Sequence, residues 1–338
     1  PLCLVGSEMC IRDRYTIIAI PVGSLIPAMT QDRDERTSLA SFRYLGASSG
    51  SIAVAVLTLP LVGLFSSPQF GFPIVVGCLA VLGAIFAFLC FFNTKEVYSK
   101  PYEETIGIKK VTKMVFNNYP LHFVILALLT TWVANNIKQL TVVYFVKYNL
   151  QLEAYFSPIL LGVILQIMFG AYLVNLIKHR FEKKTLFMIG TFLYVITDLI
   201  IYYITGYENF WLLAFIATFG FIGFGMAGVM AWSMIADTIE YGEWKSGFRA
   251  EGVLNAAHVF VFKLSVGFSA WLAGVILEST DYVANAIDQS PETLNGLFIM
   301  GYIFPAVAGT IAIIVTYFNK YDSNFYERIF SELKQRQS

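Results

Sequence analysis

Long apolar runs, separated by short polar segments, constrain this chain more than any other feature of its sequence. A helix needs about 20 consecutive apolar residues to cross the hydrocarbon core of a bilayer. A shorter apolar run covers Tyr15–Met29, and full-length runs follow at 44–64, 73–92, 120–147, 155–177, 185–205, 210–235, 251–279 and 294–318. The chain is therefore predicted to be an all-α polytopic membrane protein with eight complete spans plus a remnant.

The composition supports a membrane environment. Hydrophobic residues make up 57% of the chain and charged residues only 14%, whereas soluble proteins carry about 25% charged residues. So much apolar surface cannot be buried in one soluble core, but lipid accepts apolar side chains all round a helix. The formal net charge is zero, so no nucleic-acid partner is expected. The lipid bilayer is the expected partner, and the oligomeric state is left open.

Histidine and cysteine are scattered along the chain without metal-ligand or catalytic spacing. We therefore expect no metal and no cofactor, and the chain is not predicted to be an enzyme. A membrane enzyme is the alternative from a different functional class.

Basic residues alternate between the polar segments. They occur in segments 30–43, 93–119, 178–184 and 236–250 and in the tail after 318, and they are absent from 65–72, 148–154, 206–209 and 280–293. Cytoplasmic loops carry an excess of Lys and Arg, so this alternation places the tail in the cytosol. We expect a multi-pass protein of the inner (cytoplasmic) membrane.

The longest basic segment suggests how the spans are grouped. Six spans follow segment 93–119, and two spans plus the remnant precede it. A carrier built from two six-helix bundles would therefore have about three more spans upstream. The expected divisions are 15–92 for the remainder of an N-terminal helix bundle, 93–119 for a cytosolic inter-bundle loop, 120–318 for a C-terminal six-helix bundle and 319–338 for a cytosolic tail.

The leader, residues 1–14, differs from the rest of the chain. Residues 5–14 read VGSEMCIRDR, which is the translation of one frame of a transposon adaptor used in shotgun sequencing. A secretory signal would place its basic residues before its apolar core. We therefore interpret the leader as an adaptor artefact and the chain as N-terminally truncated; a native leader is the alternative.

Several polar residues lie inside the apolar runs. Lys263 lies near the middle of its span and Lys138 partway into another, with Asn135 and Asn136 beside it. A charge at the bilayer centre costs about 2.5–3.5 kcal/mol on insertion scales, so such residues usually line a cavity or pair with one another. These four residues are candidates for substrate binding, with structural ion pairing as the alternative. Asp198 could belong to an ion path, or it could be a neutral acid hydrogen-bonded to a neighbouring helix.

Two clusters of mixed charge lie on the side predicted to be cytosolic. A salt-bridge network between them could hold one conformation of an alternating-access carrier and break in another; the alternative is a pair of solvated loops. The candidate gate residues are Asp32, Arg36, Asp237, Glu240, Glu243, Arg249 and Glu251.

The same clusters carry a family resemblance. The runs SLIPAMTQDRDERTSLASFR (Ser24–Arg43), MIADTIEYGEWKSGFRAEG (Met234–Gly252) and FKLSVGFSAWLAG (Phe262–Gly274) resemble motifs of the glycoside–pentoside–hexuronide:cation symporters, a branch of the major facilitator superfamily. The resemblance covers residues 15–338. It implies the major-facilitator two-bundle fold of twelve helices and uptake of a glycoside coupled to Na⁺, Li⁺ or H⁺.

The resemblance also implies residue roles. Lys263 matches a lysine near the sugar and cation sites, and Arg43 matches a sugar-binding arginine. Members that carry melibiose have Asp and Trp where this chain has Ala19 and Gly23, and Trp where it has Gly228, so a different sugar is expected. The family's cation-binding carboxylates lie on a helix that precedes this chain, so no cation ligand is named.

The expected function is secondary active import of a glycoside or related sugar, coupled to Na⁺ or H⁺, by alternating access. Three alternatives remain open. The same fold could carry a non-sugar solute such as a lysolipid, the chain could be an inactive fragment, or it could be a membrane enzyme.

Overall fold

The computed structural model describes most of the chain from residue 33 onward. The described residues are 33–65, 67–95, 107–152, 155–248, 251–283, 288–320 and 323–337, together with Val22, Leu25, Met29, Thr30 and Ala286. The predicted remnant at 15–29 and the leader therefore lie almost entirely outside them.

Eight helices of the described residues are long and apolar enough to span a membrane. They occupy Glu35–Val62, Gln69–Asn93, Tyr119–Asn149, Phe156–Ile177, Lys183–Thr205, Phe210–Ser246, Gly252–Ser279 and Pro291–Phe318. Each coincides with one of the eight full-length runs of the sequence, so the predicted number of complete spans is confirmed. No strand occurs in the part of the chain that the structure describes.

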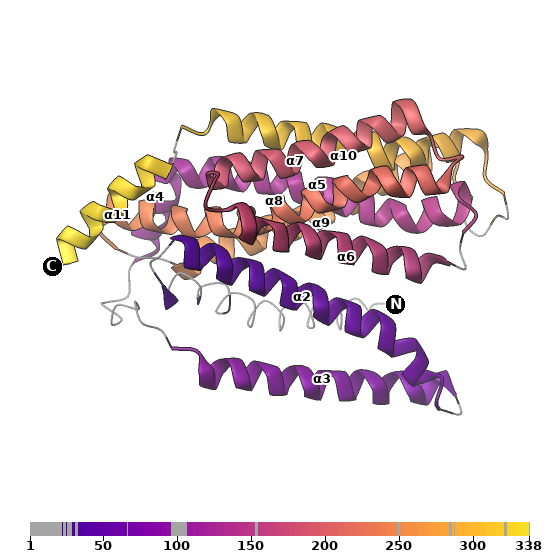
Figure 1. The fold of residues 1–338 in the computed structure, drawn as a ribbon, viewed down its shortest axis with the longest axis horizontal. Helices are drawn as coiled ribbons and strands as arrows, with labels where there is room; N and C mark the ends of the chain where they lie inside the picture. Colours follow the sequence, from indigo (N-terminus) through magenta and orange to yellow (C-terminus); the bar gives the residue numbers. More distant parts are fainter. Residues whose placement is uncertain are drawn as a thin grey trace.

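Six of these helices form one bundle (Figure 1). They are α5 (Tyr119–Tyr144), α6 (Phe156–Ile177), α7 (Lys183–Ile200), α8 (Phe210–Ser246), α9 (Glu251–Ser279) and α10 (Pro291–Phe318). Short π-helical turns, η1 (Phe145–Asn149) and η3 (Ile201–Thr205), extend α5 and α7. Helix α8 packs against α6 and α7, and α5 packs against α9 and α10, so α5 and α8 form the interior of the bundle.

Glycines allow α6 and α8 to approach closely. Added Cβ atoms at Gly170 of α6 and Gly225 of α8 would overlap the backbone carbonyls of Ile222 and Ile167 respectively. Small residues let membrane helices pack backbone to backbone. The crossing of α6 and α8 therefore depends on the absence of side chains at both positions.

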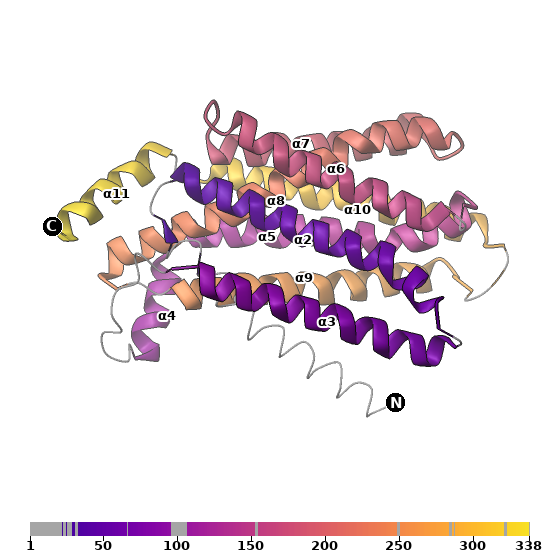
Figure 2. The ribbon, with the colours of Figure 1, turned by 60° about the horizontal axis from the view of Figure 1, so that its bottom comes forward.

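The two remaining long helices, α2 (Arg33–Val62) and α3 (Pro68–Asn93), lie outside this bundle (Figures 1 and 2). Helix α2 contacts α6 and α8, and α3 packs against α2. Apolar side chains of α3 such as Phe70, Phe86 and Phe91 are exposed, as on a helix that faces lipid or further helices. The described chain thus consists of a six-helix bundle with two more spans on one side.

Several segments that we predicted as loops are helical. Helix α2 begins at Arg33, inside segment 30–43, and α8 continues to Ser246, so the charged clusters lie largely on helix ends. Helix α8 stops at Gly247, whose φ of 78° is the left-handed conformation that commonly follows a helix. Apolarity predicts where a helix leaves the hydrocarbon, but the helix itself continues wherever its polar side chains find partners.

Two amphipathic helices also lie in segments predicted as a loop and a tail. Helix α4 (Ile108–Asn117) occupies the end of segment 93–119, and α11 (Ser323–Gln337) occupies most of segment 319–338. Helix α11 packs against α8 through Tyr326 and Ile329.

Candidate transport site and gate

Helices α2 and α8 run antiparallel along a shared contact. Arg36, Thr37 and Tyr44 of α2 face Glu240, Ser233 and Gly228 of α8 in that order. Residues seven apart on a helix lie on one face, which is why Thr37 and Tyr44 both face α8. This contact and the packing of α2 against α6 join α2 to the six-helix bundle.

A buried ion pair lies at one end of this contact. The guanidinium of Arg36 pairs with the carboxylate of Glu240, and the two side chains are 0% and 3% exposed. Arg36 also donates from Nε to the carbonyl oxygen of Thr30 at 2.9 Å. A buried charge is tolerated when an opposite charge pairs with it, as Arg36 and Glu240 do here.

Further polar contacts surround this pair. The hydroxyls of Thr37 and Ser233 lie 3.2 Å apart. Lys178, directly after α6, donates to the hydroxyl of Ser38 at 2.5 Å. Asp237 pairs with Lys183 of α7 at 2.8 Å. Hydrogen bonds and ion pairs thus join α2, α6, α7 and α8 at this end.

The structure brings the predicted gate residues together only in part. Arg36 and Glu240 pair directly, whereas Asp237 pairs with Lys183, which was not among the predicted gate residues. Glu243 is buried. Asp32, Arg249 and the side chain of Glu251 lie outside the described residues.

An aromatic cluster follows the ion pair along α2 and α8. The guanidinium carbon of Arg43 lies 4.3 Å from the ring centre of Trp232, which is cation–π distance. The ring of Trp232 lies 4.3 Å, edge to face, from that of His258 of α9. His258 is 3% exposed, and neither ring nitrogen has a hydrogen-bond partner among the described residues. Buried polar groups are normally hydrogen-bonded, so His258 is a candidate ligand-binding residue.

Tyr44 and Trp132 extend this cluster. The ring of Tyr44 lies over Gly228, where an added Cβ would come within 3.0 Å of it. Trp132 of α5 stands edge to face against Phe262 of α9 at 4.9 Å between ring centres. Its indole nitrogen is buried and has no partner among the described residues. The cluster therefore combines aromatic faces with hydrogen-bonding groups that no described residue uses.

One stripe of α9 carries the residues that face α5 and α8. His258, Phe262, Ser265 and Ser269 recur at spacings of three and four, which is one helix face. Asn136 donates to the hydroxyl of Ser265 at 3.0 Å, and Ser269 donates to the carbonyl of Val133 at 3.3 Å. Among the predicted substrate-binding residues, Asn136 therefore lies where α5 meets α9.

The remaining predicted residues of this set lie differently. Lys263 is exposed and, two residues from Ser265, points to another side of α9. Asn135 is buried in α5.

Lys138 and Asp198 pair with each other. The ammonium of Lys138 on α5 binds Oδ1 of Asp198 on α7, and the side chains are 12% and 1% exposed. The ammonium also lies 4.5 Å from the ring centre of Tyr194 and 5.2 Å from those of Phe221 and Tyr302. Oδ2 of Asp198 has no hydrogen-bond partner among the described residues. The structure thus joins a predicted substrate-binding residue to the predicted ion-path residue inside the bundle.

Sequence reasoning did not place His258, Trp132 or Trp232 in the site. The usable signal for His258 was its position inside an apolar run, where a polar side chain indicates a functional role. Nothing comparable distinguishes Trp132 and Trp232, because aromatic residues are frequent in this chain.

These features define a multi-pass membrane protein with the architecture of a carrier. The chain belongs to the MFS/sugar transport protein family, whose model matches residues 3–323.

Comparisons with individual proteins agree. The chain is 33% identical to an uncharacterized symporter, YjmB, of Bacillus subtilis strain 168, over 95% of this chain and 70% of the relative. It is 32% identical to a putative sulfoquinovose importer of Escherichia coli strain K12, over 96% of this chain and 69% of the relative. The crystal structure of the Major Facilitator Superfamily transporter FucP has the same fold, with a TM-score of 0.59, 12% identity, and coverage of 89% of this chain and 72% of that one.

Proposed function

We propose that this chain carries a glycoside or related sugar into the cell and couples the import to inward movement of Na⁺ or H⁺. Membership of a sugar transport family supports the class of solute, and similarity to a protein named a symporter supports coupling to an ion. The coupling ion is either Na⁺ or H⁺.

The observation that carries this proposal is the contact between α2 and α8. The side-chain contacts of α2 with α8, from Arg36 to Tyr44, lie in the first half of α2. The Arg43–Trp232–His258 cluster and the buried ion pair lie on the same contact, about two helical turns apart. A binding cluster beside a breakable contact between two helix groups is what alternating access requires.

In this mechanism the solute binds at the Arg43–Trp232–His258 cluster. The rings of Trp232 and Trp132 offer apolar faces to a sugar ring. Arg43 and Asn136 offer donors to its hydroxyl groups, and His258 offers a donor and an acceptor. Lys263 offers a further donor from another side of α9. We assign Asn135 and Lys138 supporting positions in the bundle, because both are largely buried.

We assign the gate to the cytosolic side of the inner membrane. The positive-inside rule supports this orientation, with the C-terminal tail in the cytosol. Breaking the Arg36–Glu240 pair would let α2 separate from α8 and release the solute inward. Asp237 with Lys183, and the charged residues Asp32, Glu243, Arg249 and Glu251, would stabilise the same end.

We assign Asp198 to a possible ion path. Its carboxylate is held by a single ammonium through one oxygen, and its other oxygen has no partner among the described residues. A proton or cation reaching that oxygen would compete with Lys138 and loosen the contact between α5 and α7.

Uptake by the purified chain in liposomes tests this function. A panel of radiolabelled mono- and disaccharides, uronates and a lysolipid is supplied under an inward Na⁺ gradient, an inward proton gradient or no gradient. We expect one sugar class to accumulate above its equilibrium level under one gradient, and an ionophore for that ion to abolish the accumulation. Equal uptake under all three conditions would exclude coupling, and transport of a lysolipid but of no sugar would exclude the proposed cargo.

A further inference from the structure

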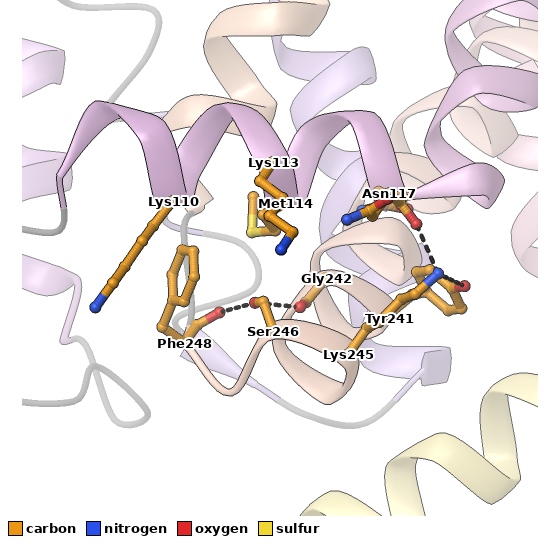
Figure 3. A pocket seen from close by; sticks show the side chains of 10 residues that line it. Lys110, Lys113, Met114, Asn117, Tyr241, Gly242, Lys245, Ser246 and Phe248 are labelled. Carbon is orange, nitrogen blue, oxygen red and sulfur yellow. Dashed lines mark hydrogen bonds between the residues drawn. The ribbon is translucent and has the colours of Figure 1, made fainter.

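A basic pocket lies where α4 meets the end of α8 (Figure 3). Its volume is about 350 Å³. Lys110 and Lys113 of α4 and Lys245 of α8 contribute to its wall, and no acidic side chain lines it among the described residues. The uncharged lining includes Met114, Asn117, Asn118, Tyr241, Gly242, Ser246 and Phe248.

Packing fixes both walls of the pocket. Met114 of α4 is buried in a cluster with Ile239 of α8 and Leu254 of α9. Asn118, directly after α4, donates from Nδ2 to the carbonyl of Thr238 at 2.8 Å. Lys110 and Lys113 are three residues apart and therefore project from one side of this anchored helix.

The three ammonium groups differ in what they already bind. Lys245 donates to the carbonyl of Asn117 at 3.0 Å and to the hydroxyl of Tyr241 at 3.3 Å, so its side chain is held in place. The ammonium groups of Lys110 and Lys113 make no hydrogen bond or ion pair with another described residue. Like charges held around one cavity repel each other, and an anion with several oxygens relieves that repulsion.

The position of the pocket indicates which anion. Helix α4 is amphipathic and leads through Asn118 into the membrane span that starts at Tyr119. Phe116 is 73% exposed and Tyr119 is half-exposed beside the pocket. Aromatic side chains gather at the level of the lipid headgroups, and basic pockets at the cytoplasmic end of membrane helices bind anionic headgroups.

We propose that Lys110, Lys113 and Lys245 form a binding site for a phosphate group, which the headgroup of an anionic phospholipid supplies. A bound phosphate links α4 to the turn of α8 that follows Glu240. Occupancy therefore stabilises the end of α8 that carries Glu240, the partner of Arg36 in the proposed gate.

Native mass spectrometry of the purified chain in detergent tests the site, with phosphatidylglycerol as the probe and phosphatidylcholine as the neutral lipid. We expect phosphatidylglycerol to bind more tightly than phosphatidylcholine. In the double variant Lys110→Gln/Lys113→Gln its apparent Kd rises roughly 30-fold, which corresponds to about 1 kcal/mol for each lysine. Lys109→Gln is the matched control, because Lys109 is an exposed lysine of the same helix outside the pocket lining.

Further outcomes of these measurements decide the proposal. An unchanged Kd in the double variant, or an equal loss in Lys109→Gln, overturns the site. Binding of inorganic phosphate that the double variant abolishes, without preference for phosphatidylglycerol, keeps the phosphate site and overturns the lipid as its source. Should the double variant fail to fold, Lys113→Gln alone is measured, with retention of binding in Lys113→Arg as the expected result.

Discussion

Arg36 of α2 and Glu240 of α8 form an ion pair from which solvent is excluded, although the two residues lie far apart in the sequence. Each charge is tolerated in this place because the other is present. The pair therefore makes the closed contact between α2 and α8 conditional on both residues, as a two-state gate requires.

Replacing one partner should open this contact. In Glu240→Gln the guanidinium of Arg36 stays buried without a counter-charge, and breaking a buried pair in this way costs on the order of 3–5 kcal/mol. We expect a lower Tm and faster labelling of a cysteine placed at Ser233, which is buried against Thr37. The measurement is the rate of reaction with a soluble maleimide.

An exposed ion pair provides the control for this experiment. Arg328 and Glu332 pair at 2.9 Å on α11, where the arginine is 78% exposed. Arg328→Gln should change stability by about 0.5 kcal/mol or less and leave the labelling rate unchanged. Equal labelling in Glu240→Gln and the parent would mean that the pair does not hold the contact closed.

Two glycine-to-alanine substitutions on α6 should distinguish the effect of close packing against α8 on stability from the effect of helix propensity. Gly170→Ala places a methyl group against the carbonyl of Ile222 and should force α6 away from α8. Gly162→Ala lies on the same helix with nothing within 4 Å. There it should be neutral or stabilise by up to about 1 kcal/mol, because alanine favours helix.

Thermal unfolding in detergent measures both glycine variants. We expect Tm to fall in Gly170→Ala and to stay level or rise in Gly162→Ala. A fall of the same size in both would attribute the effect to helix propensity or to lipid contacts rather than to the α6–α8 crossing.

The sequence predicts the spans well because apolarity reports directly on contact with lipid. It predicts the ends of the helices poorly. Helix α8 continues through charged residues to Ser246, since Asp237 and Glu240 find cationic partners on neighbouring helices. Apolarity alone contains no information about such partners.

For the same reason, the sequence does not predict which side chains pair between different helices. Lys138 and Asp198 were each identifiable as costly charges within a span. Nothing in one sequence states that α5 and α7 bring them into contact. The resemblance to known symporters singled out Lys263 and Arg43, but the indole face under Arg43 and the neighbouring His258 emerged only from the fold.

A double variant should decide between a structural and a transport role for the Lys138–Asp198 pair. Asp198→Asn leaves the ammonium of Lys138 among aromatic rings without its carboxylate, so we expect lower stability and lost accumulation. Lys138→Met/Asp198→Asn removes both charges and should restore most of the stability. If accumulation also returns, the pair is structural and the ion path through Asp198 is wrong. If only Tm returns, the carboxylate takes part in coupling.

Lys263→Ala should abolish solute accumulation without destabilising the protein. The side chain is exposed on α9, so its truncation creates no buried cavity and should change stability by about 0.5 kcal/mol or less. Its ammonium is one of few charges near the middle of a span, where a charge persists when it serves a ligand or an ion.

Uptake in liposomes and Tm are measured together, with Lys320→Ala, an exposed lysine after the last span, as the control. Lys263→Arg keeps the charge but changes the donor geometry, so partial uptake there indicates that charge matters, and no uptake indicates that the ammonium itself binds. Full accumulation by Lys263→Ala removes this residue from the mechanism and leaves solute binding to the Arg43–Trp232–His258 cluster.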